Sequence, residues 1–510
     1  MLAIDSLKKS IASNLYERIE KKYTMKKLFR LLLRLFLLAM VIIAGIIIVK
    51  TSGVSSRQAI IEPIAPVSIK EGAENRLSGA IQIPTISDPK DFDESTFLDL
   101  DTFIQKKYPL VTSILERIEV TPLSIVLKWA GKHADLQPVL LMGHTDVVPV
   151  EGDNNQWQED PFSGVIKDGF IWGRGTLDDK LTVFSILESI EQLLAEGYSP
   201  NRNIYLAFGH DEETGGKQGA QQIADWFKKE KIQFEYILDE GLLILEDAVT
   251  GLKQPAAMIG IAEKGYVTLD LTARLKNGGH SSMPPAETAI GVLSMAIVNL
   301  QENPFPATID GATGIFFDHI APEMSWPFKA LISNRWLTES LLIHQLSKEP
   351  ASNAIVRTTT APTIISGGIK DNVLPSEASA KVNFRIRPGE TQATVADHVR
   401  EIIADPRIEV SIDMGNEPSA ISGTESFGFQ VIQKSIQEVF PGVIVAPSLV
   451  IGGTDSRHYQ DLSDNIYRFM PVMIHKEDLT RIHGKNERVS VENYHQSIRF
   501  FRQLILNSGK

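Results

Sequence analysis

Acidic residues and histidines cluster directly after hydrophobic stretches at several places in this sequence. The clusters lie in LLMGHTDVV at 140–148, GRGTLDDK at 173–180, FGHDEETGG at 208–216, ILDEGL at 237–242 and RIHGKNERV at 481–489. Side chains alternate along an extended strand, so His144 and Asp146 would point to the same side, toward one object beyond the strand end. If the clusters meet, roughly five carboxylates would share a cleft with two imidazoles, and a bound pair of divalent metal ions would stabilise that charge.

Each cluster taken alone also has a simpler explanation. Asp178 and Asp179 precede a helix expected to begin at Lys180, and aspartates are favoured as caps at the positive end of a helix. Glu212 and Glu213 would likewise suit the solvated start of a helix. The recurrence of such clusters at strand ends is what favours a shared metal centre over five unrelated surface features.

The regions around these clusters alternate between strand and helix patterns. Strands are expected at SIVLKW, PVLLMGH, NIYLAFGH and FEYILDEG, and helices at 180–196 and 218–229. This alternation predicts an α/β fold with a mixed, largely parallel sheet. In such sheets the active site lies at the carboxyl ends of the strands, which is where the clusters fall.

The pattern changes near Gly265. YVTLDLTARL alternates with a period of two, and a helix at 287–300, strands at TIISGG and SAKVNFRIRP, a helix at 394–403 and a strand at IEVSIDM follow. This order predicts a small ferredoxin-like α+β domain inserted into the first domain. The expected boundaries are 1–50 for a basic cytoplasmic segment and membrane anchor, 51–105 for a stalk and entry segment, 106–264 and 415–510 for the two parts of the catalytic domain, and 265–414 for the insert. The stretch 304–362, with Trp326 and Trp336, is left without an assignment.

Composition excludes several classes of function. The chain has 510 residues, which predicts two or more domains. Its formal net charge of -12 argues against a nucleic-acid partner, because phosphate binding needs clustered Lys and Arg. It has no cysteine, which removes disulfides, thiolate nucleophiles and Cys-ligated metals. Metal ligands must therefore be His, Asp or Glu.

The amino terminus has a different character. Up to Arg34 it carries nine Lys or Arg against three acidic residues, and 35–49 has no charge. The stretch 31–49 is close to the ~20 residues that span a bilayer, and basic residues before it predict a cytoplasmic amino terminus with the rest outside. The alternative is a signal peptide that starts at Met25 and is cleaved, which would give a secreted protein. We favour the uncleaved anchor, with the catalytic domain outside the cytoplasm.

The ordered series of motifs from about residue 90 to 510 carries a resemblance to a known family. HxD at 144–146, GRGTLDDK, DEETGG, LDEG and the late HGKNE resemble the di-zinc metallopeptidase family that includes aminoacylase-1, carboxypeptidase G and carboxypeptidase S. Within it, the hydrophobic amino-terminal segment, GGTDSRH and a longer lid are most similar to the branch of Gly-X carboxypeptidases and N-fatty-acyl-amino acid hydrolases. The resemblance implies an inserted domain that serves as a lid and for dimerisation, and hence a homodimer.

The resemblance also implies metal ligands. Asp178 would bridge two Zn²⁺ ions in each subunit, with Co²⁺ or Mn²⁺ as possible alternatives. The remaining ligands would be His144, Glu213, His483 and an acid of LDEG, either Asp239 or Glu240, with a slight preference for Glu240.

Catalytic roles follow from the same resemblance. Asp146 would hold the ring of His144, as metal-ligating histidines commonly require. Glu212 would be the general base that takes a proton from the attacking water and passes it to the leaving nitrogen. His280, in NGGHSSMPP, would reach the active site of a partner subunit and polarise the scissile carbonyl.

Substrate-binding residues are expected in three further motifs. Asn372 in KDNVLP and Arg385 in NFRIRP resemble positions that contact the carbonyl and the free carboxylate of the substrate. Gly453, Thr454 and Arg457 in GGTDSRH resemble a segment that binds the same carboxylate. For Arg385, an ordinary charged residue on a strand face is an equally good explanation.

These features predict a metal-dependent hydrolase that cleaves the amide bond of an N-acyl amino acid or a short peptide with a free carboxyl terminus. Two alternatives remain. One is an inactive membrane-tethered binding protein on the same fold, which the full set of ligands and base disfavours. The other is an aminopeptidase, which would need acidic groups to recognise a substrate amine, whereas Arg385 and the glycine-containing loop favour a carboxylate.

Overall fold

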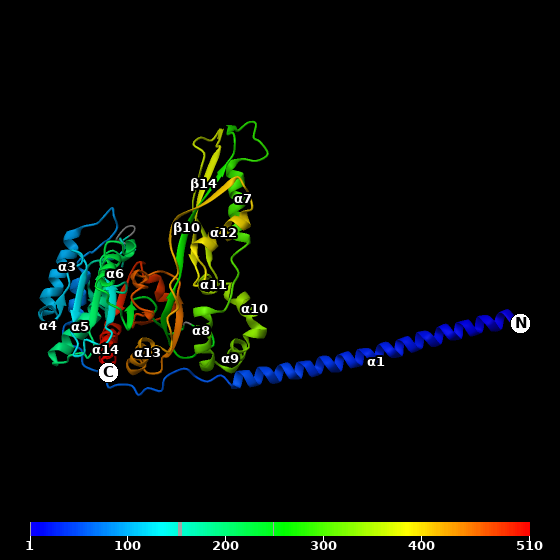
Figure 1. Cartoon of the computed structure of the whole chain (residues 1–510), viewed down its shortest axis with the longest axis horizontal. Helices are drawn as coiled ribbons and strands as arrows, with labels where there is room; N and C mark the ends of the chain where they lie inside the picture. The colour runs from blue at the N-terminus through cyan, green and yellow to red at the C-terminus, as the bar shows by residue number, and fades with distance from the viewer. Residues whose placement is uncertain (1, 151–155, 248, 510) are drawn as a thin grey trace.

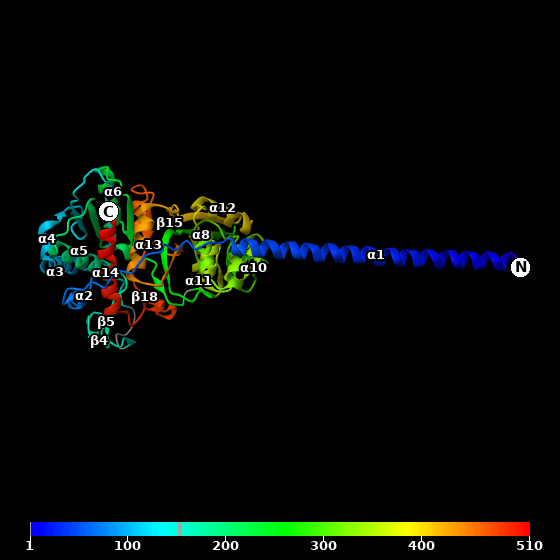
Figure 2. The same ribbon diagram turned by 90° about the horizontal axis from the view of Figure 1, so that it is seen from below.

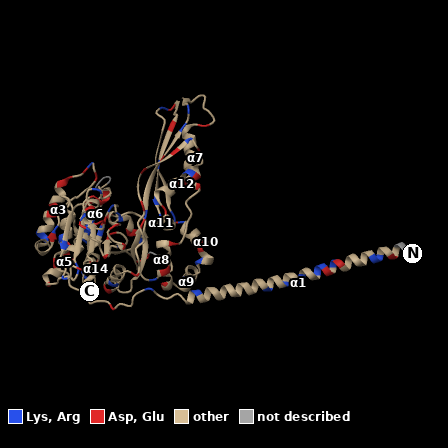
Figure 3. Ribbon diagram, viewed as in Figure 1, with Lys and Arg blue, Asp and Glu red and all other residues tan. Residues whose placement is uncertain are grey.

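The computed structural model describes residues 2–150, 156–247 and 249–509. Its first element is one long helix, α1 (Leu2–Ser52), which projects away from the rest of the molecule (Figures 1 and 2). Most charged residues of α1 lie in its amino-terminal half (Figure 3). Among the described residues, α1 is the one helix long and apolar enough to cross a membrane.

The catalytic half of the chain is built on a ten-stranded mixed sheet. Its strand order is β1-β2-β6-β3-β7-β17-β9-β8-β18, with β16 paired to β9. The bounds are β1 (Glu116–Arg117), β2 (Ile125–Trp129), β3 (Val139–His144), β6 (Ile204–Gly209), β7 (Tyr236–Asp239), β8 (Ile244–Leu245), β9 (Ala256–Glu263), β16 (Ile444–Val450), β17 (Ile466–Arg468) and β18 (Met473–Ile474). The central strands β6, β3, β7 and β17 run parallel. The α/β fold with a mixed sheet agrees with the sequence prediction.

Helices cover both faces of this sheet, which explains why its central strands are continuously apolar. Leu141 of β3 packs in the cluster that contains α5 (Lys180–Ala195), α13 (Phe427–Val439) and α14 (Val491–Ser508). The neighbouring Leu140 points to the other face and packs with Ile223 and Phe227 of α6 (Ala220–Lys229). Because side chains alternate between the two faces of the strand, β3 contributes residues to two separate hydrophobic cores.

The segment expected to be a stalk is only partly extended. The chain from Gly53 to Glu71 lacks regular structure, but α2 (Ala73–Ile81) and α3 (Glu94–Lys107) fold onto the catalytic domain, followed by α4 (Pro109–Ile114). Leu77 of α2 and Leu100 of α3 are buried in the same cluster as α5. Both helices carry apolar residues at helical spacing, so burying these faces against α5 makes them part of the domain.

The inserted region contains a four-stranded antiparallel sheet with the order β12-β14-β10-β15. Along the chain its elements are β10 (Gly265–Arg274), β11 (Gly279–His280), α7 (Ala289–Glu302), β12 (Thr359–Gly367), β13 (Val373–Leu374), β14 (Glu377–Ile386), α12 (Gln392–Ile403) and β15 (Ile408–Asn416). The four main strands and two helices have the order and pairing of a ferredoxin-like domain. This unit projects from the side of the main sheet (Figure 1).

The unassigned stretch 304–362 folds mainly as helices between α7 and β12. They are α8 (Gly311–Ile320), α9 (Trp326–Ser333), α10 (Arg335–Leu346) and α11 (Pro350–Val356), which we call the helical insert. The insert has its own hydrophobic cluster, which includes Phe317, Ile332 and Leu342. It lies beside the carboxyl-terminal end of α1 (Figures 1 and 2).

Candidate metal centre and active site

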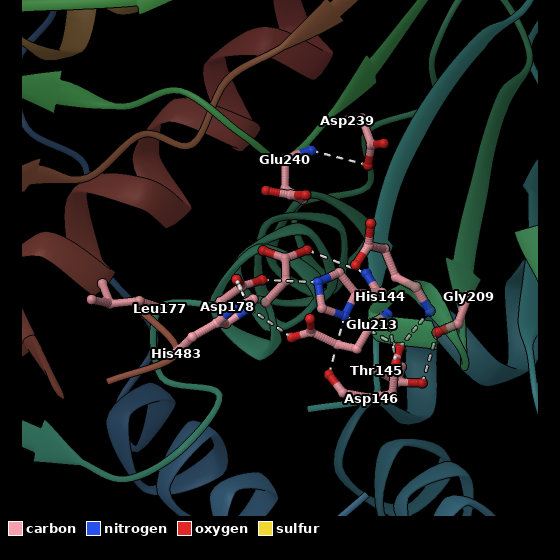
Figure 4. A network of polar contacts seen from close by, with 12 residues as sticks. His144, Thr145, Asp146, Leu177, Asp178, Gly209, Glu213, Asp239, Glu240 and His483 are labelled. Carbon is pink, nitrogen blue, oxygen red and sulfur yellow. Dashed lines mark hydrogen bonds and ion pairs between the residues drawn. The ribbon is translucent and has the colours of Figure 1, made fainter. Parts of the chain in front are cut away.

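The predicted site residues of the catalytic domain meet at the carboxyl ends of the parallel strands. His144 is the last residue of β3, and Asp239 is the last residue of β7. Strand β6 ends at Gly209 and leads into a short 3-10 helix, η2 (Glu212–Thr214). Asp178 lies in the turn before α5, and His483 arrives from the carboxyl-terminal part of the chain (Figure 4).

Asp178 bridges the two histidines of the cluster. Its Oδ1 lies 2.9 Å from Nε2 of His144, and its Oδ2 lies 3.0 Å from Nε2 of His483. The same nitrogen of His483 is 3.1 Å from Oε1 of Glu213. His144, Asp178 and Glu213 each offer a ligand atom, and these atoms lie within 4.8 Å of one another. The donor set of imidazole nitrogens and carboxylate oxygens around a shared aspartate suits divalent metal ions.

The electrostatics of the cluster also fit a bound cation. Burial would raise the pKa of Asp178, but its contacts with His144 and His483 hold that pKa well below the usual value. Contacts with Asp178 and Glu213 raise the pKa of His483 to about 10. Burial raises the pKa of Glu213, and more strongly that of Glu240. These carboxylates therefore need positive charge beside them, which two divalent ions would supply in place of protons on the histidines.

The two acids of LDEG have different surroundings. The carboxylate of Asp239 accepts hydrogen bonds from the backbone N–H of Glu240 at 3.0 Å and of Ser456 at 2.8 Å. Burial raises the pKa of Glu240, the neighbouring carboxylate of Asp178 raises it further, and His144 partly opposes the rise. In Figure 4 the two carboxylates point in different directions. The geometry therefore favours Glu240 as the group that faces the metal centre and Asp239 as a support for the surrounding backbone.

The carboxylate of Asp146 has four contacts within the site. Its Oδ1 lies 3.3 Å from Nδ1 of His144 and accepts the N–H of Glu212 at 3.1 Å. Its Oδ2 accepts the N–H of Glu213 at 3.1 Å and the hydroxyl of Ser87 at 2.7 Å. One buried carboxylate thus fixes both the ring of His144 and the turn that carries the two glutamates.

Glu212 is a carboxyl group whose surroundings disfavour its charged form. Burial raises its pKa well above the usual value, and the neighbouring carboxylates of Asp455, Glu213 and Asp146 act in the same direction. His144 partly opposes the shift. A carboxyl group whose pKa is raised in this way suits general acid and base chemistry.

Sequence reasoning did not identify a buried ion pair that joins two loops of the site. Arg174 donates through Nη1 to Glu487, and through Nη2 to the backbone oxygen of His483 at 3.0 Å. Glu487 also accepts the N–H of Leu177 at 2.8 Å and of Asp178 at 3.3 Å. Arg174 lies within GRGTLDDK, four residues before Asp178, and Glu487 lies within RIHGKNERV, four residues after His483. Their positions in these two motifs were the feature of the sequence that could have indicated the pair. The pair holds the loops of Asp178 and His483 together.

Three predicted residues lie on the inserted domain and outside this cluster. His280 is exposed on β11, and its Nδ1 is 2.8 Å from the hydroxyl of Ser282. Asn372 is near it in the structure, because its backbone oxygen accepts the N–H of Ser281 at 3.2 Å. Arg385 is exposed on β14, with its guanidinium 5.6 Å from the ring centre of Tyr266. Within the described chain, no contact joins these three side chains to the metal ligands.

The GGTDSRH loop lies beside the main cluster. Thr454 donates its N–H and its hydroxyl to Glu263, each at 3.1 Å, and begins the 3-10 helix η4 (Asp455–Tyr459). Gly453 is close to Arg457, since a Cβ at this glycine would lie 3.2 Å from Nη1 of that arginine. Arg457 also lies near Gly215, which follows the glutamates of η2. The structure thus brings a partly exposed guanidinium to the edge of the site.

Comparisons with known proteins find similar sequences and a similar fold. The model of peptidase family M20/M25/M40 matches residues 140–507. The N-fatty-acyl-amino acid synthase/hydrolase PM20D1 of Xenopus tropicalis is 40% identical over 489 residues, covering 94% of this chain and 95% of that protein. The probable carboxypeptidase S-like 2 of Dictyostelium discoideum is 41% identical over 503 residues, covering 96% of each. An M20 family metallo-carboxypeptidase from Sulfolobus solfataricus has a similar fold, with a TM-score of 0.62 at 18% identity, covering 86% of this chain and 99% of that one.

Proposed function

Because this chain belongs to peptidase family M20/M25/M40, we propose that it hydrolyses the amide bond of N-acyl amino acids or short peptides with a free carboxyl terminus. Its relatives named as N-fatty-acyl-amino acid hydrolase and carboxypeptidase S-like protein support metal-dependent hydrolysis of such bonds. The observation that carries the proposal is the partly buried Asp178, which lies between two histidines, together with the partly buried Glu212 in the turn that also carries Glu213.

The working metal in this proposal is zinc, with two ions per chain. His144, Asp178 and Glu240 would hold one ion, and Asp178, Glu213 and His483 the other. When bound, such a pair lowers the pKa of water and polarises a carbonyl oxygen. Co²⁺ or Mn²⁺ would suit the same oxygen and nitrogen ligands.

The side chains of the chain itself perform the remaining steps. Glu212 takes a proton from the attacking water and delivers it to the leaving nitrogen. Asp146 keeps His144 and the backbone of Glu212 in place through the contacts described above. Arg457 is the residue at the edge of the site whose charge suits the free carboxylate of the substrate.

In this proposal, His280 acts in the active site of a second subunit and not in the site of its own chain. Because it is exposed on the inserted domain and contacts Ser282 rather than the metal ligands, it would polarise the scissile carbonyl in a partner's site. Exposed apolar residues on the same domain support a homodimer. They include Met295 on α7, Ile364 and Ile365 on β12 and Met414 on β15. Asn372 and Arg385 would then contact the substrate when the inserted domain closes as a lid.

We further propose that α1 anchors the enzyme in a membrane with its catalytic domain outside the cytoplasm. The support is its length, its apolar carboxyl-terminal half and the basic residues that precede that half. Cleavage of this segment would instead release a secreted enzyme.

Hydrolysis of matched substrates tests the proposed function. The full chain is assayed in detergent with N-acyl amino acids and dipeptides, and with the same compounds amidated at the carboxyl terminus. We expect chelator-sensitive turnover of the free acids, weak turnover of the amides, and loss of activity in Glu212→Gln. Glu230→Gln, an exposed residue after α6, is the matched control and should keep full activity. Turnover that persists in Glu212→Gln, or no turnover of any substrate with metal bound, would contradict the proposal.

A further inference from the structure

The helical insert is fixed to the last turns of α1. Asn334 donates from Nδ2 to the hydroxyl of Thr51 at 3.1 Å, and both residues are buried. Lys329 of α9 donates from Nζ to the backbone oxygen of Val54 at 3.1 Å. Ile43 and Ile47 precede Thr51 at intervals of four residues and are the partly buried positions in the last three turns of α1. One face of the anchor helix is therefore turned toward the insert.

The contacts between α1 and the helical insert determine the depth at which the insert would lie in a membrane spanned by α1. The uncharged stretch of α1 ends at Val49, and Lys50 follows it directly. Ile43 lies eight residues before Thr51, or about 12 Å along a helix that rises 1.5 Å per residue. If this stretch spans the bilayer, the side of the insert that contacts α1 extends from the level of the lipid headgroups, near Thr51, into the outer part of the acyl chains, near Ile43.

The surface of the insert beside this contact is apolar and exposed. Trp326 at the start of α9 is 59% exposed, and Trp336, Leu337 and Leu341 on α10 are 51%, 50% and 60% exposed. We call these four residues the interfacial face. Leu337 and Leu341 share one side of α10, because they are four positions apart, and Trp336 lies about 100° from Leu337 around the helix. Trp is the residue type enriched where a membrane meets water, since its ring is apolar and its N–H needs a polar partner.

Positive charge borders the interfacial face. The ammonium of Lys50 lies 5.5 Å from the ring centre of Trp336, and Lys50, Arg57, Arg335 and Trp336 line one cleft where α1 meets the insert. Asp318, which pairs with Arg335 at 2.7 Å, is the acid in the lining of that cleft. The excess of cations suits lipid phosphate groups, which attract basic residues close to a membrane surface.

We propose that the interfacial face rests in the outer leaflet of the membrane that α1 spans, with lipid phosphates at the cleft of Lys50, Arg57 and Arg335. This inference depends on the anchor described under the proposed function and adds a second membrane contact to it. Two membrane contacts, by α1 and by the insert that is bonded to it, would restrict the orientation of the protein on the membrane. A substrate with a long acyl chain, which partitions into that leaflet, would then be presented to an enzyme lying on the same surface.

Quenching of tryptophan fluorescence by brominated lipids tests the proposal. The full chain, which has six tryptophans, is reconstituted into phosphatidylcholine vesicles with bromine near the glycerol end of the acyl chains. We expect quenching of the wild-type emission and loss of most of the quenchable part in Trp326→Phe/Trp336→Phe. Trp226→Phe is the control, because Trp226 lies on α6 of the catalytic domain and should leave the quenching unchanged.

Other outcomes separate this proposal from the ones on which it rests. Equal quenching in the double variant and the wild type, or none in chains that float with the vesicles, would overturn the interfacial contact alone. Chains that do not float would overturn the anchor as well. A double variant that changes from dimer to monomer in detergent would assign the face to a second copy of the chain and refute the proposal. Hydrolysis of a short soluble substrate, recorded in parallel, reports independently on the proposed function.

Discussion

Replacing Asp146 by asparagine tests how the site is held together. The two carboxylate oxygens of Asp146 receive the N–H groups of Glu212 and Glu213 and the hydroxyl of Ser87. Nδ1 of His144 lies 3.3 Å from Oδ1 of Asp146 and 3.1 Å from the backbone oxygen of the same residue. Asparagine keeps the shape but has one acceptor oxygen and an NH₂ group, so at least one backbone N–H would face another donor.

The magnitude follows from the cost of that unpaired donor. A buried donor without a partner costs about 1–3 kcal/mol, which corresponds to roughly 5- to 160-fold in an equilibrium or a rate. The backbone oxygen of residue 146 still faces Nδ1 of His144 in the variant, but the negative charge beside the ring is lost. Changing such a partner of a metal-ligating histidine typically costs about 10- to 100-fold in metal affinity or activity. We therefore expect Asp146→Asn to lower kcat/KM by about 100-fold and to bind metal more weakly.

The assay is steady-state hydrolysis of an N-acyl amino acid at increasing zinc concentration, with metal content measured by atomic absorption. Ser87→Ala is the matched control, because it removes one neutral donor and leaves the carboxylate with its other three contacts. Its expected cost is about 0.5–1.5 kcal/mol, or roughly tenfold at most. If Asp146→Asn is no more impaired than Ser87→Ala, the contacts of Asp146 do not position the catalytic groups and the reasoning is wrong.

Three further predictions follow from the site and its surroundings. Glu240→Gln should remove one of the two metal ions whereas Asp239→Asn should retain both, as measured by metal content per chain; the opposite result would reassign the ligand. Mixing inactive His280→Ala and Glu212→Gln subunits should restore activity, because a mixed dimer contains one site with both groups intact; no recovery in verified mixed dimers would exclude a role for His280 across subunits. Burial lowers the pKa of Lys264 from 10.5 to about 7. The unfolded chain then binds more protons than the folded one between those values, so the free energy of unfolding should rise with pH there by up to about 1.4 kcal/mol per pH unit relative to Lys264→Met. Parallel pH curves in urea unfolding would contradict that assignment.

The family resemblance predicted from the sequence is confirmed by the match over residues 140–507, and so is the general class of reaction. The family and the class of reaction were predicted from the resemblance carried by the ordered motifs HxD, GRGTLDDK, DEETGG, LDEG and HGKNE. The sheet and the shared position of the site residues were predicted from two features of the pattern. Apolar runs separated by helical patterns indicate an α/β sheet, and polar residues directly after those runs must lie at one edge of it. Both are local patterns, so one sequence was sufficient to predict that His144, Asp178 and Glu213 would lie together.

The sequence by itself determined which residue types were available to the site and the order in which strands deliver them. The tertiary structure decided the contacts between distant segments. Arg174 and Glu487 are 313 positions apart, and the docking of Asn334 on Thr51 spans 283. Neither contact can be predicted from hydrophobic periodicity, because each depends on how helices and loops that are distant in the sequence pack against one another. The same holds for Glu240 and Asp239, since neighbouring carboxylates become distinct only when the N–H of Ser456, from another part of the chain, binds one of them.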